Sequence, residues 1–159
     1  MRLSVIGLAG LLLAAGALAV ERRNVFISTD HGISIEAPVS ADAAPNLQIA
    51  VFFLPPSNNF AANVNVQKQQ FTGPIEDYDK LSASQFKQFG LTVLNRTLKG
   101  NEARYEYKGD VEGKRMHWYA RSIKAGDYVY LVTATGLEEQ WDRQKLVLMK
   151  SVESFVLKQ

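Results

Sequence analysis

The feature that most constrains the fold is the segment from Lys114 to Gly136, which reads KRMHWYARSIKAGDYVYLVTATG. Two runs rich in aromatic and β-branched residues flank Ala125-Gly126, the pattern of two strands joined by a tight turn. The segment therefore predicts a β-hairpin. This hairpin brings a His, a Trp, two Arg and three Tyr close together, either as a binding surface or as the middle of a packed sheet.

Other apolar or alternating runs predict further strands. Leu47 to Leu54 (LQIAVFFL) is a continuous apolar run that ends at Pro55-Pro56, and this pattern predicts a strand buried on both faces. Phe60 to Phe71 alternates between apolar and polar residues, which predicts a half-exposed strand. The remaining predicted strands are residues 24–28 and 33–37 around an Asp30-His31-Gly32 turn, residues 91–98, and residues 103–108 after a Gly100-Asn101 turn.

Two amphipathic helices complete the predicted order of elements. The first opens at Gly73-Pro74, has acidic residues in its first turn and ends at Gly90, which is suited to a left-handed cap. The second opens at a capping box, Thr135-Gly136-Leu137-Glu138, and runs to about Leu157. The expected apolar faces are Ile75, Tyr78, Leu81, Phe86 and Phe89 on the first helix, and Leu137, Trp141, Leu148, Val152 and Phe155 on the second.

This order of elements predicts the fold class. Consecutive strands joined by tight turns imply an antiparallel sheet, and amphipathic helices have to pack on such a sheet. The expected fold is α+β, an antiparallel β-sheet with amphipathic helices packed on it. The length predicts one domain, residues 20–159, large enough to bury a core of its own.

The N-terminus predicts export from the cytoplasm. Arg2 is followed by the apolar run LSVIGLAGLLLAAGALAV, which ends in small residues, and this is the pattern of a signal peptide over residues 1–19. Cleavage fits after Ala19 or after Ala17. The alternative is an uncleaved N-terminal anchor, because the run is near the lower length limit for a membrane span. The expected location is the bacterial periplasm or the extracellular medium, with no stable span after signal cleavage.

Composition excludes several classes of chemistry and of partner. The chain of 159 residues has no Cys, which excludes disulfides, thiol chemistry, Cys-ligated zinc and a lipid anchor on Cys. Its formal net charge of +2 is too small to imply nucleic acid or an anionic membrane as the main partner.

Three segments carry a family resemblance: PIEDYDKLSASQFKQFG, NEARYEYKGDVEGKRMHWYARSIKAGDYVYLVTATG and EEQWDRQKLVLMKSVESFVL. In this order they resemble the PsbP-like superfamily over residues 24–158. That superfamily includes the extrinsic PsbP protein of photosystem II, the bacterial DcrB-like envelope proteins and the chaperones of type six secretion effectors. The resemblance implies a PsbP-like fold and action through protein binding or assembly, without shared catalytic residues. A DcrB-like envelope protein is the nearest match, although this chain lacks that group's lipid-anchoring Cys.

Strand pairing predicts which side chains share a face of the sheet. An Ala125-Gly126 turn pairs Arg121 with Tyr130, and a four-residue turn over 110–113 pairs Tyr105 with Trp118. One face is then apolar and forms the core, with Tyr105, Tyr107, Met116, Trp118, Ala120, Val129 and Leu131. The second face holds Arg104, Glu106, Lys108, Arg115, His117, Tyr119, Arg121, Tyr128 and Tyr130.

The second face is the predicted surface for a partner, since Tyr and Arg are typical anchors of protein interfaces. The alternative is a solvated sheet face, or one that a helix partly covers. The loop Pro55 to Phe60 (PPSNNF) adds Phe60 as a further anchor. The candidate partner surface is Arg104, Arg115, His117, Tyr119, Arg121, Tyr128, Tyr130 and Phe60.

No catalytic set is recognisable in the sequence. His31 and His117 are far apart, and without Cys a metal site would require carboxylates brought in by the fold. There is no G-x-S-x-G motif, and the Gly residues stand singly at turns. We therefore expect no enzyme activity, no cofactor and no metal.

The sequence predicts an exported, non-catalytic protein that acts by protein binding or assembly in the cell envelope. Two alternatives remain open. One is an immunity or inhibitor protein directed against an envelope toxin or hydrolase, which predicts a one-to-one complex. The other is a carrier of a small ligand, which predicts a pocket lined by Tyr and Trp between sheet and helix.

Overall fold

The computed structural model describes residues 25–29, 32–36 and 47–158. The chain divides into two units, residues 1–45 and residues 46–159. In the first unit, β1 (Val25–Ser28) and β2 (Ile33–Glu36) pair antiparallel, which confirms the predicted strand pair. The predicted domain, residues 20–159, spans both units. The predicted signal peptide (1–19), His31 and the loop 41–45 lie outside the described residues.

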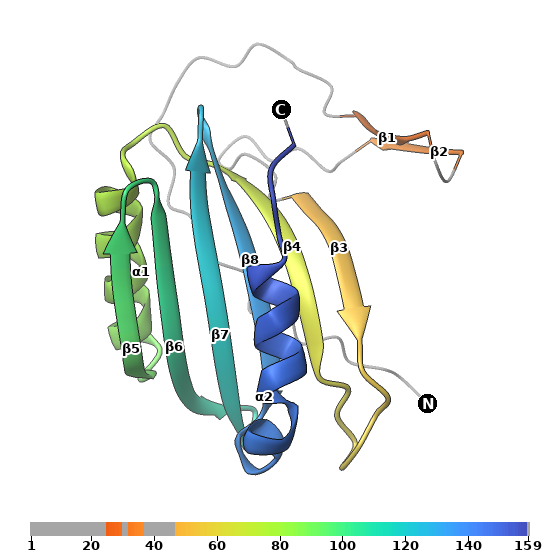
Figure 1. Ribbon diagram of the computed structural model, residues 1–159, viewed down its shortest axis with the longest axis vertical. Helices are drawn as coiled ribbons and strands as arrows, with labels where there is room; N and C mark the ends of the chain where they lie inside the picture. The colour runs from red at the N-terminus through yellow and green to blue at the C-terminus, as the bar shows by residue number, and fades with distance from the viewer. Residues whose placement is uncertain (1–24, 30–31, 37–46, 159) are drawn as a thin grey trace. The chain divides into compact units, whose positions relative to one another are not determined.

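The second unit is a six-stranded antiparallel sheet with two helices (Figure 1). The strand order across the sheet is β3-β4-β8-β7-β6-β5, so β5 to β8 form a meander and β4 joins it beside β8. The α+β class is therefore confirmed. The bounds are β3 (Leu47–Phe53), β4 (Asn63–Gln70), α1 (Ile75–Gln88), β5 (Thr92–Lys99), β6 (Glu102–Val111), β7 (Lys114–Ala125), β8 (Tyr128–Leu137) and α2 (Glu138–Glu153).

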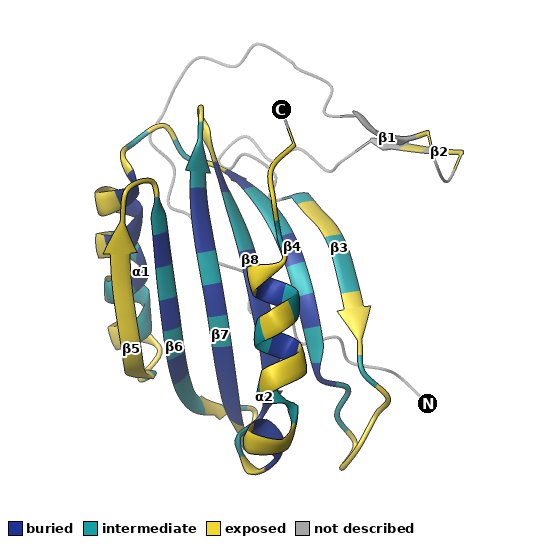
Figure 2. Ribbon diagram, in the orientation of Figure 1, coloured by how far each residue is buried: buried dark blue, intermediate teal, exposed yellow. Residues whose placement is uncertain are grey.

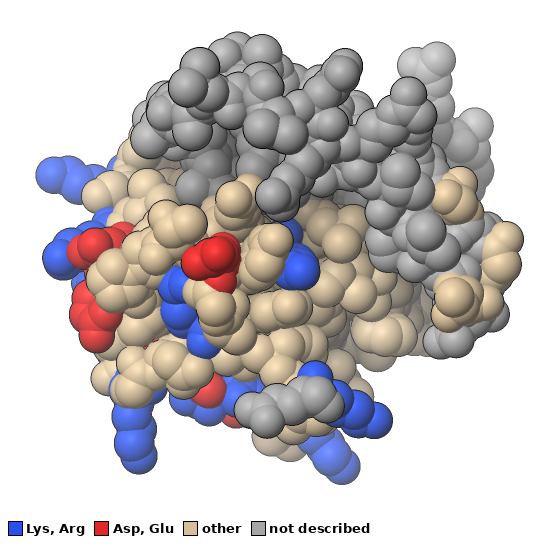
Figure 3. All heavy atoms as spheres, turned by 90° about the horizontal axis from the view of Figure 1, so that it is seen from above, with Lys and Arg blue, Asp and Glu red and all other residues tan. Residues whose placement is uncertain are grey.

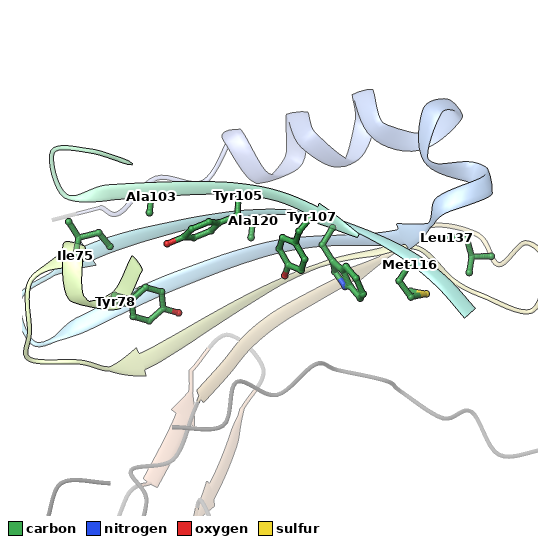
Figure 4. Close-up of a cluster of buried hydrophobic side chains, with 10 residues drawn as sticks. Ile75, Tyr78, Ala103, Tyr105, Tyr107, Met116, Ala120 and Leu137 are labelled. Atoms are coloured by element: carbon green, nitrogen blue, oxygen red, sulfur yellow. The ribbon is translucent and has the colours of Figure 1, made fainter. Parts of the chain in front are cut away.

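The first face of the sheet is the predicted core, and α1 packs on it. Tyr105 and Tyr107 point from β6 to the side opposite α2 (Figure 4). The ring of Tyr107 stacks on that of Trp118 of β7, with centroids 5.1 Å apart. Ile75 and Tyr78 of α1 complete this cluster. The predicted face is confirmed, with Leu131 packed at its margin.

Local sequence signals position α1 as expected. Pro74 precedes its first turn, Glu76 and Asp77 lie at the positive helix end, and Gly90 has a φ of 65° just after it. An ion pair between the exposed Arg96 and the buried Asp79 then fixes the helix to the sheet. Arg96 of β5 donates from Nε to Asp79 Oδ1 at 2.7 Å and from Nη2 to Oδ2, and the Tyr105 hydroxyl donates to Oδ1 at 3.0 Å.

The hairpin registers differ from the prediction by two residues. Tyr105 pairs with Ala120 and not with Trp118, and Arg121 pairs with Val132 and not with Tyr130. The first turn has two residues, 112–113, and not four, because β6 continues to Val111. The second turn has two residues as predicted but lies one residue later, at 126–127. A slip of two leaves every side chain on its own face, since side chains alternate with a period of two. The predicted registers were therefore wrong, but the predicted assignment of these residues to the two faces was correct.

The start of α2 differs from the prediction because β8 continues through Leu137. Thr135 and Gly136 are strand residues, the N-cap position is Leu137, and no side chain caps the helix, so the capping box was wrong. The helix ends at Glu153 and not at about 157. Leu137 joins the core under the first face, whereas Trp141 and the later apolar residues of α2 face the opposite side of the sheet.

Helix α2 covers the second face with a separate apolar cluster. Trp141, Leu148 and Val152 pack against Val64, Val66, Val132 and Ala134 of β4 and β8. The alternation of β4 is therefore as predicted, with Ala62, Val64 and Val66 buried. Gly136 allows close approach here, since a Cβ built on it would lie 3.2 Å from Cε3 of Trp141.

Candidate functional site

The predicted partner surface is brought together by the fold, but much of it lies around α2. Residues Arg104, His117, Tyr119 and Arg121 come from β6 and β7, on the face over which α2 runs (Figure 1). Each of these four side chains contacts α2 or the residues that follow it. The site therefore has to be examined at the two ends of the helix.

At the C-terminal end of α2, Glu153 is the shared acceptor. Arg104 donates to both of its carboxylate oxygens, at 3.0 and 3.1 Å, and the Tyr119 hydroxyl donates to Oε1 at 2.6 Å. The hydrogen bond from Arg104 is the main reason that the pKa of Glu153 is lowered. Burial, with the Glu153 carboxylate next to it, raises the pKa of Tyr119 to about 12. Both shifts keep the ionised acid and the neutral phenol in place.

Arg121 fixes the backbone at the same end of the helix. Its Nη1 donates to the carbonyl oxygens of Glu153 and Phe155, at 3.2 and 2.9 Å. Its Nε and Nη2 donate to the carboxylate of Glu102 on β6, at 2.8 and 2.9 Å. A cation at a helix C-terminus is favourable because the last carbonyl groups lack partners within the helix. Arg121 is therefore bound within the chain.

At the N-terminal end of α2, His117 is buried between two carboxylates. Its Nδ1 lies 2.5 Å from Oε2 of Glu138, and its Nε2 lies 2.9 Å from Oε1 of Glu106. The ring also stacks on Trp141, with centroids 4.1 Å apart. Lys108 donates to the other oxygen of Glu138 at 2.7 Å. Both ring nitrogens and one ring face are thus in contact with the protein.

The electrostatics of Glu138 show a balance of opposing effects. Partial burial raises its pKa, whereas the hydrogen bonds from Lys108 and His117 lower it, and the net shift is downward. The carboxylate is therefore held ionised beside two donors. Such an arrangement fastens the helix start to β6 and β7.

The other four predicted residues are placed differently from one another. Arg115 is exposed. Tyr128 is also exposed, and Lys68 lies 3.9 Å from its ring centroid, while the ring of Tyr130 lies 6.2 Å from that of Phe155. Phe60 is partly buried and packs against both core clusters, so it is part of the packing rather than an exposed anchor.

The second face is therefore not one open surface, and its role in binding a partner stays a prediction. The alternative that a helix covers it partly is the one that the structure has. The physical reason is that the Arg and Tyr side chains, which are suited to recognising a partner, here recognise the last turn of α2. The alternation of a strand does not say which element packs on a face.

The loop 55–60 is also fastened to this layer. Asn58 and Asn59 have φ values of 50° and 56°, which form a tight turn closed by a bridge between Ser57 and Phe60. Asn58 Nδ2 donates to Glu139 at 2.6 Å, and Gln140 Nε2 donates to Ser57 Oγ at 3.2 Å. The loop therefore supports the start of α2.

Among the described residues, the most exposed aromatic side chains lie on β3, where the sequence predicts burial on both faces. β3 is an edge strand, paired with β4 alone among the described strands. Phe52 is 63% exposed and Phe53 56% exposed, and Ile49 is exposed at a bulge in the strand (Figure 2). The prediction was wrong because an apolar run indicates burial without saying what covers it. The absence of charge from Leu47 to Gln67 is the visible sequence signal.

The opposite edge strand, β5, is exposed along its whole length and has a different chemistry. It contains Arg96 and Lys99 together with Asn and Thr residues, and it has a bulge between Val93 and Asn95. Charged residues and bulges are devices that prevent an edge from pairing with another chain. Of the two edges, β3 is thus the one without charge.

Charge on the described surface is mixed. Basic and acidic side chains lie next to each other in the view from above (Figure 3). Within the described ranges, no three His, Asp or Glu side chains are placed to hold a metal ion. None of the helices described is long and apolar enough to cross a membrane.

The fold defines the class as an α+β protein with an open six-stranded antiparallel sheet and one helix on each face. The chain is similar to PA94 from Pseudomonas aeruginosa, a protein of unknown function described as a candidate regulator. The TM-score is 0.62 at 14% identity, over 85% of this chain and 96% of that chain. At this identity the likeness shows a shared fold alone.

The chain is also similar to the solution structure of the cyanobacterial PsbP (CyanoP) of Synechocystis sp. PCC 6803. Its TM-score is 0.46 at 12% identity, over 91% of this chain and 98% of that chain. That TM-score is too low to support an argument, so membership of the PsbP-like superfamily and the DcrB-like assignment remain predictions. No family model matches the sequence. No curated protein matches it either.

Proposed function

We propose that this chain is an exported, non-catalytic protein that binds another protein in the bacterial cell envelope. Export is inferred from the predicted signal peptide, residues 1–19. The observation that supports binding is β3, an uncharged edge strand that exposes Phe52 and Phe53 to solvent. Exposed apolar patches and unprotected strand edges mark places where another chain adds.

The mode of binding that fits β3 is addition of a strand. An extended segment of the partner would form main-chain hydrogen bonds with the free edge, and its alternate side chains would contact the two Phe rings. Phe52 pairs with Val64 and Phe53 with Asn63, so the two rings lie on opposite faces of the sheet. The partner segment would therefore be apolar on both faces. Assembly and inhibition both fit this mode, and the identity of the partner distinguishes them.

Photo-crosslinking tests this proposal. The full-length chain is expressed in its own cells with a photoreactive residue at position 52 or, as the control, at Thr97 on the charged edge β5, which is also exposed. We expect a specific protein crosslink from position 52 and none from position 97.

A charge substitution gives the matched comparison. Phe53→Lys adds a cation to the uncharged edge, and Thr97→Lys adds one to the other edge. We expect the first to remove the crosslink from position 52 and the second to leave it unchanged. Both variants should retain stability within about 0.5 kcal/mol, because both side chains are on the surface. Equal crosslinking from both edges, or none from position 52, would contradict the proposal.

A further inference from the structure

The outer side of α2 carries a row of exposed residues at positions i, i+3, i+4 and i+7. These are Arg143, Leu146, Val147 and Lys150, referred to below as the outer row. Leu146 is 80% exposed and Val147 53% exposed, although both belong to a helix whose other side is packed on the sheet. The 3.6-residue repeat of a helix puts these four positions on one side. The outer row is thus an apolar pair with a cation at each end.

Among the described residues, no acidic side chain of α2 forms an ion pair with Arg143 or Lys150. Lys108 and His117 contact Glu138, Asn58 donates to Glu139, Lys145 pairs with Asp142 at 2.6 Å, and Arg104 with Tyr119 binds Glu153. Arg143 and Lys150, in contrast, have no hydrogen bond or ion pair within the described residues. The outer row therefore presents, on each side of two exposed apolar side chains, a cation that has no ion-pair partner among the described residues.

We propose that the outer row is a second docking surface, which enters an apolar groove of a protein partner bordered by carboxylates at both ends. Anchors at i, i+3, i+4 and i+7 are the pattern by which a helix is held in a groove. Seven residues span about 10.5 Å along a helix, so the two carboxylate groups would be about that far apart. This inference rests on the proposed function in that it takes a protein as the partner, but it concerns a different surface.

Charge complementarity favours a protein over a membrane here. A basic residue near an anionic bilayer contributes about fivefold to binding, so two of them give about 25-fold. Two aliphatic side chains without an aromatic residue add little insertion, and stable attachment to a bilayer requires stronger signals. A protein groove with fixed carboxylates can contact all four residues of the outer row at once, the two cations through its carboxylates and Leu146 and Val147 through its apolar floor.

Crosslinking from the helix tests this inference. The full-length chain is expressed in its own cells with a photoreactive residue at position 147, in three forms: unchanged, with Arg143→Glu and Lys150→Glu, and with Lys87→Glu and Lys99→Glu. The last pair is the matched control, since Lys87 and Lys99 are exposed and without partners within the described residues. We expect a protein crosslink that falls more than about tenfold in the first double variant and is retained in the control.

Exchange of charge makes the result specific. Once the crosslinked peptide of the partner is mapped, its nearest carboxylates are replaced with Lys, and this should restore the crosslink to the Arg143→Glu, Lys150→Glu variant. A crosslink that is indifferent to these charges would overturn the inference. The absence of a crosslink from position 147 would also overturn it. Membrane binding would overturn it too: the protein would float with phosphatidylglycerol vesicles, and the Arg143→Glu, Lys150→Glu variant would not.

The two proposals fail in different ways. Loss of the crosslink from position 147, with the crosslink from position 52 intact, refutes the second surface and leaves the proposed function standing. The absence of crosslinks from both positions refutes the proposed function as well.

Discussion

Replacement of Arg121 by Met tests whether α2 is held on the second face as the structure indicates. The guanidinium group makes two hydrogen bonds to Glu102 and two to the carbonyl oxygens of Glu153 and Phe155. The side chain is 14% exposed, so these bonds are only weakly screened by solvent. Met retains much of the length and apolar contact of the Arg stem, and the variant therefore removes mainly the polar contacts.

The expected loss of stability is about 2 to 3 kcal/mol. The paired bonds to Glu102 account for about 1 to 2 kcal/mol, and the two bonds to carbonyl oxygens for about 0.5 kcal/mol each. The loss is not larger because Glu102 retains an ion pair with Arg104 and is not left as an unpaired buried charge.

Urea denaturation followed by circular dichroism measures this difference. With an m-value of about 1.5 to 2 kcal/mol/M, the midpoint should fall by about 1 to 2 M. Arg143→Met is the control, because Arg143 is exposed and has no partner within the described residues, and it should stay within about 0.5 kcal/mol of the parent. If Arg121→Met unfolds at the parent's urea concentration, the attachment of α2 to the second face does not depend on this contact.

Three further predictions concern the packing on the two faces of the sheet. Trp118→Ala should cost about 3 to 5 kcal/mol in equilibrium unfolding, since Trp118 is only 3% exposed, and a cost under about 1 kcal/mol would show that it is not core. The hydrogen bond from Arg96 lowers the pKa of Asp79, so the ionised pair adds stability that is present above the ordinary pKa of 3.8 and is lost as pH falls below it. Asp79→Asn should therefore flatten the acid limb of the stability profile, and an unchanged limb would count against the pair. Gly136→Ala should cost about 1 to 2 kcal/mol and alter the fluorescence of Trp141, because the added Cβ meets its ring, whereas an unchanged stability would show that the ring can move aside.

The strands and the composition of the two faces could be predicted from the sequence because they follow from local alternation. Tyr105, Tyr107 and Trp118 are core residues in the structure as in the prediction. The registers of both hairpins were nevertheless wrong by two residues. The turn sequences did not define where the strands end. A register shift of two residues leaves each side chain on the same face, so the assignment of residues to faces was still correct.

The candidate site was harder to predict because its residues interact with elements distant in the chain. Tyr119 binds Glu153, 34 residues later, and Asn58 binds Glu139, 81 residues later. Neither contact has a sequence signal, since Tyr, Arg, Asn and Glu side chains are equally suited to solvent, to a partner or to each other. Leu146 and Val147 are visible in the sequence as apolar exceptions on the polar side of the last helix, and their exposure is what the structure adds.

The sequence by itself determined the order of strands and helices in the sheet unit, the antiparallel α+β class and the apolar face of the sheet, because each depends on neighbours only a few residues apart. Tertiary structure alone decided that α2 lies on the face of Arg104, Tyr119 and Arg121, and that LQIAVFFL is an exposed edge. The physical reason is that burial is a property of what packs against a residue. An apolar run or an alternating strand is compatible with either side of the sheet being covered, and only long-range contacts choose between them.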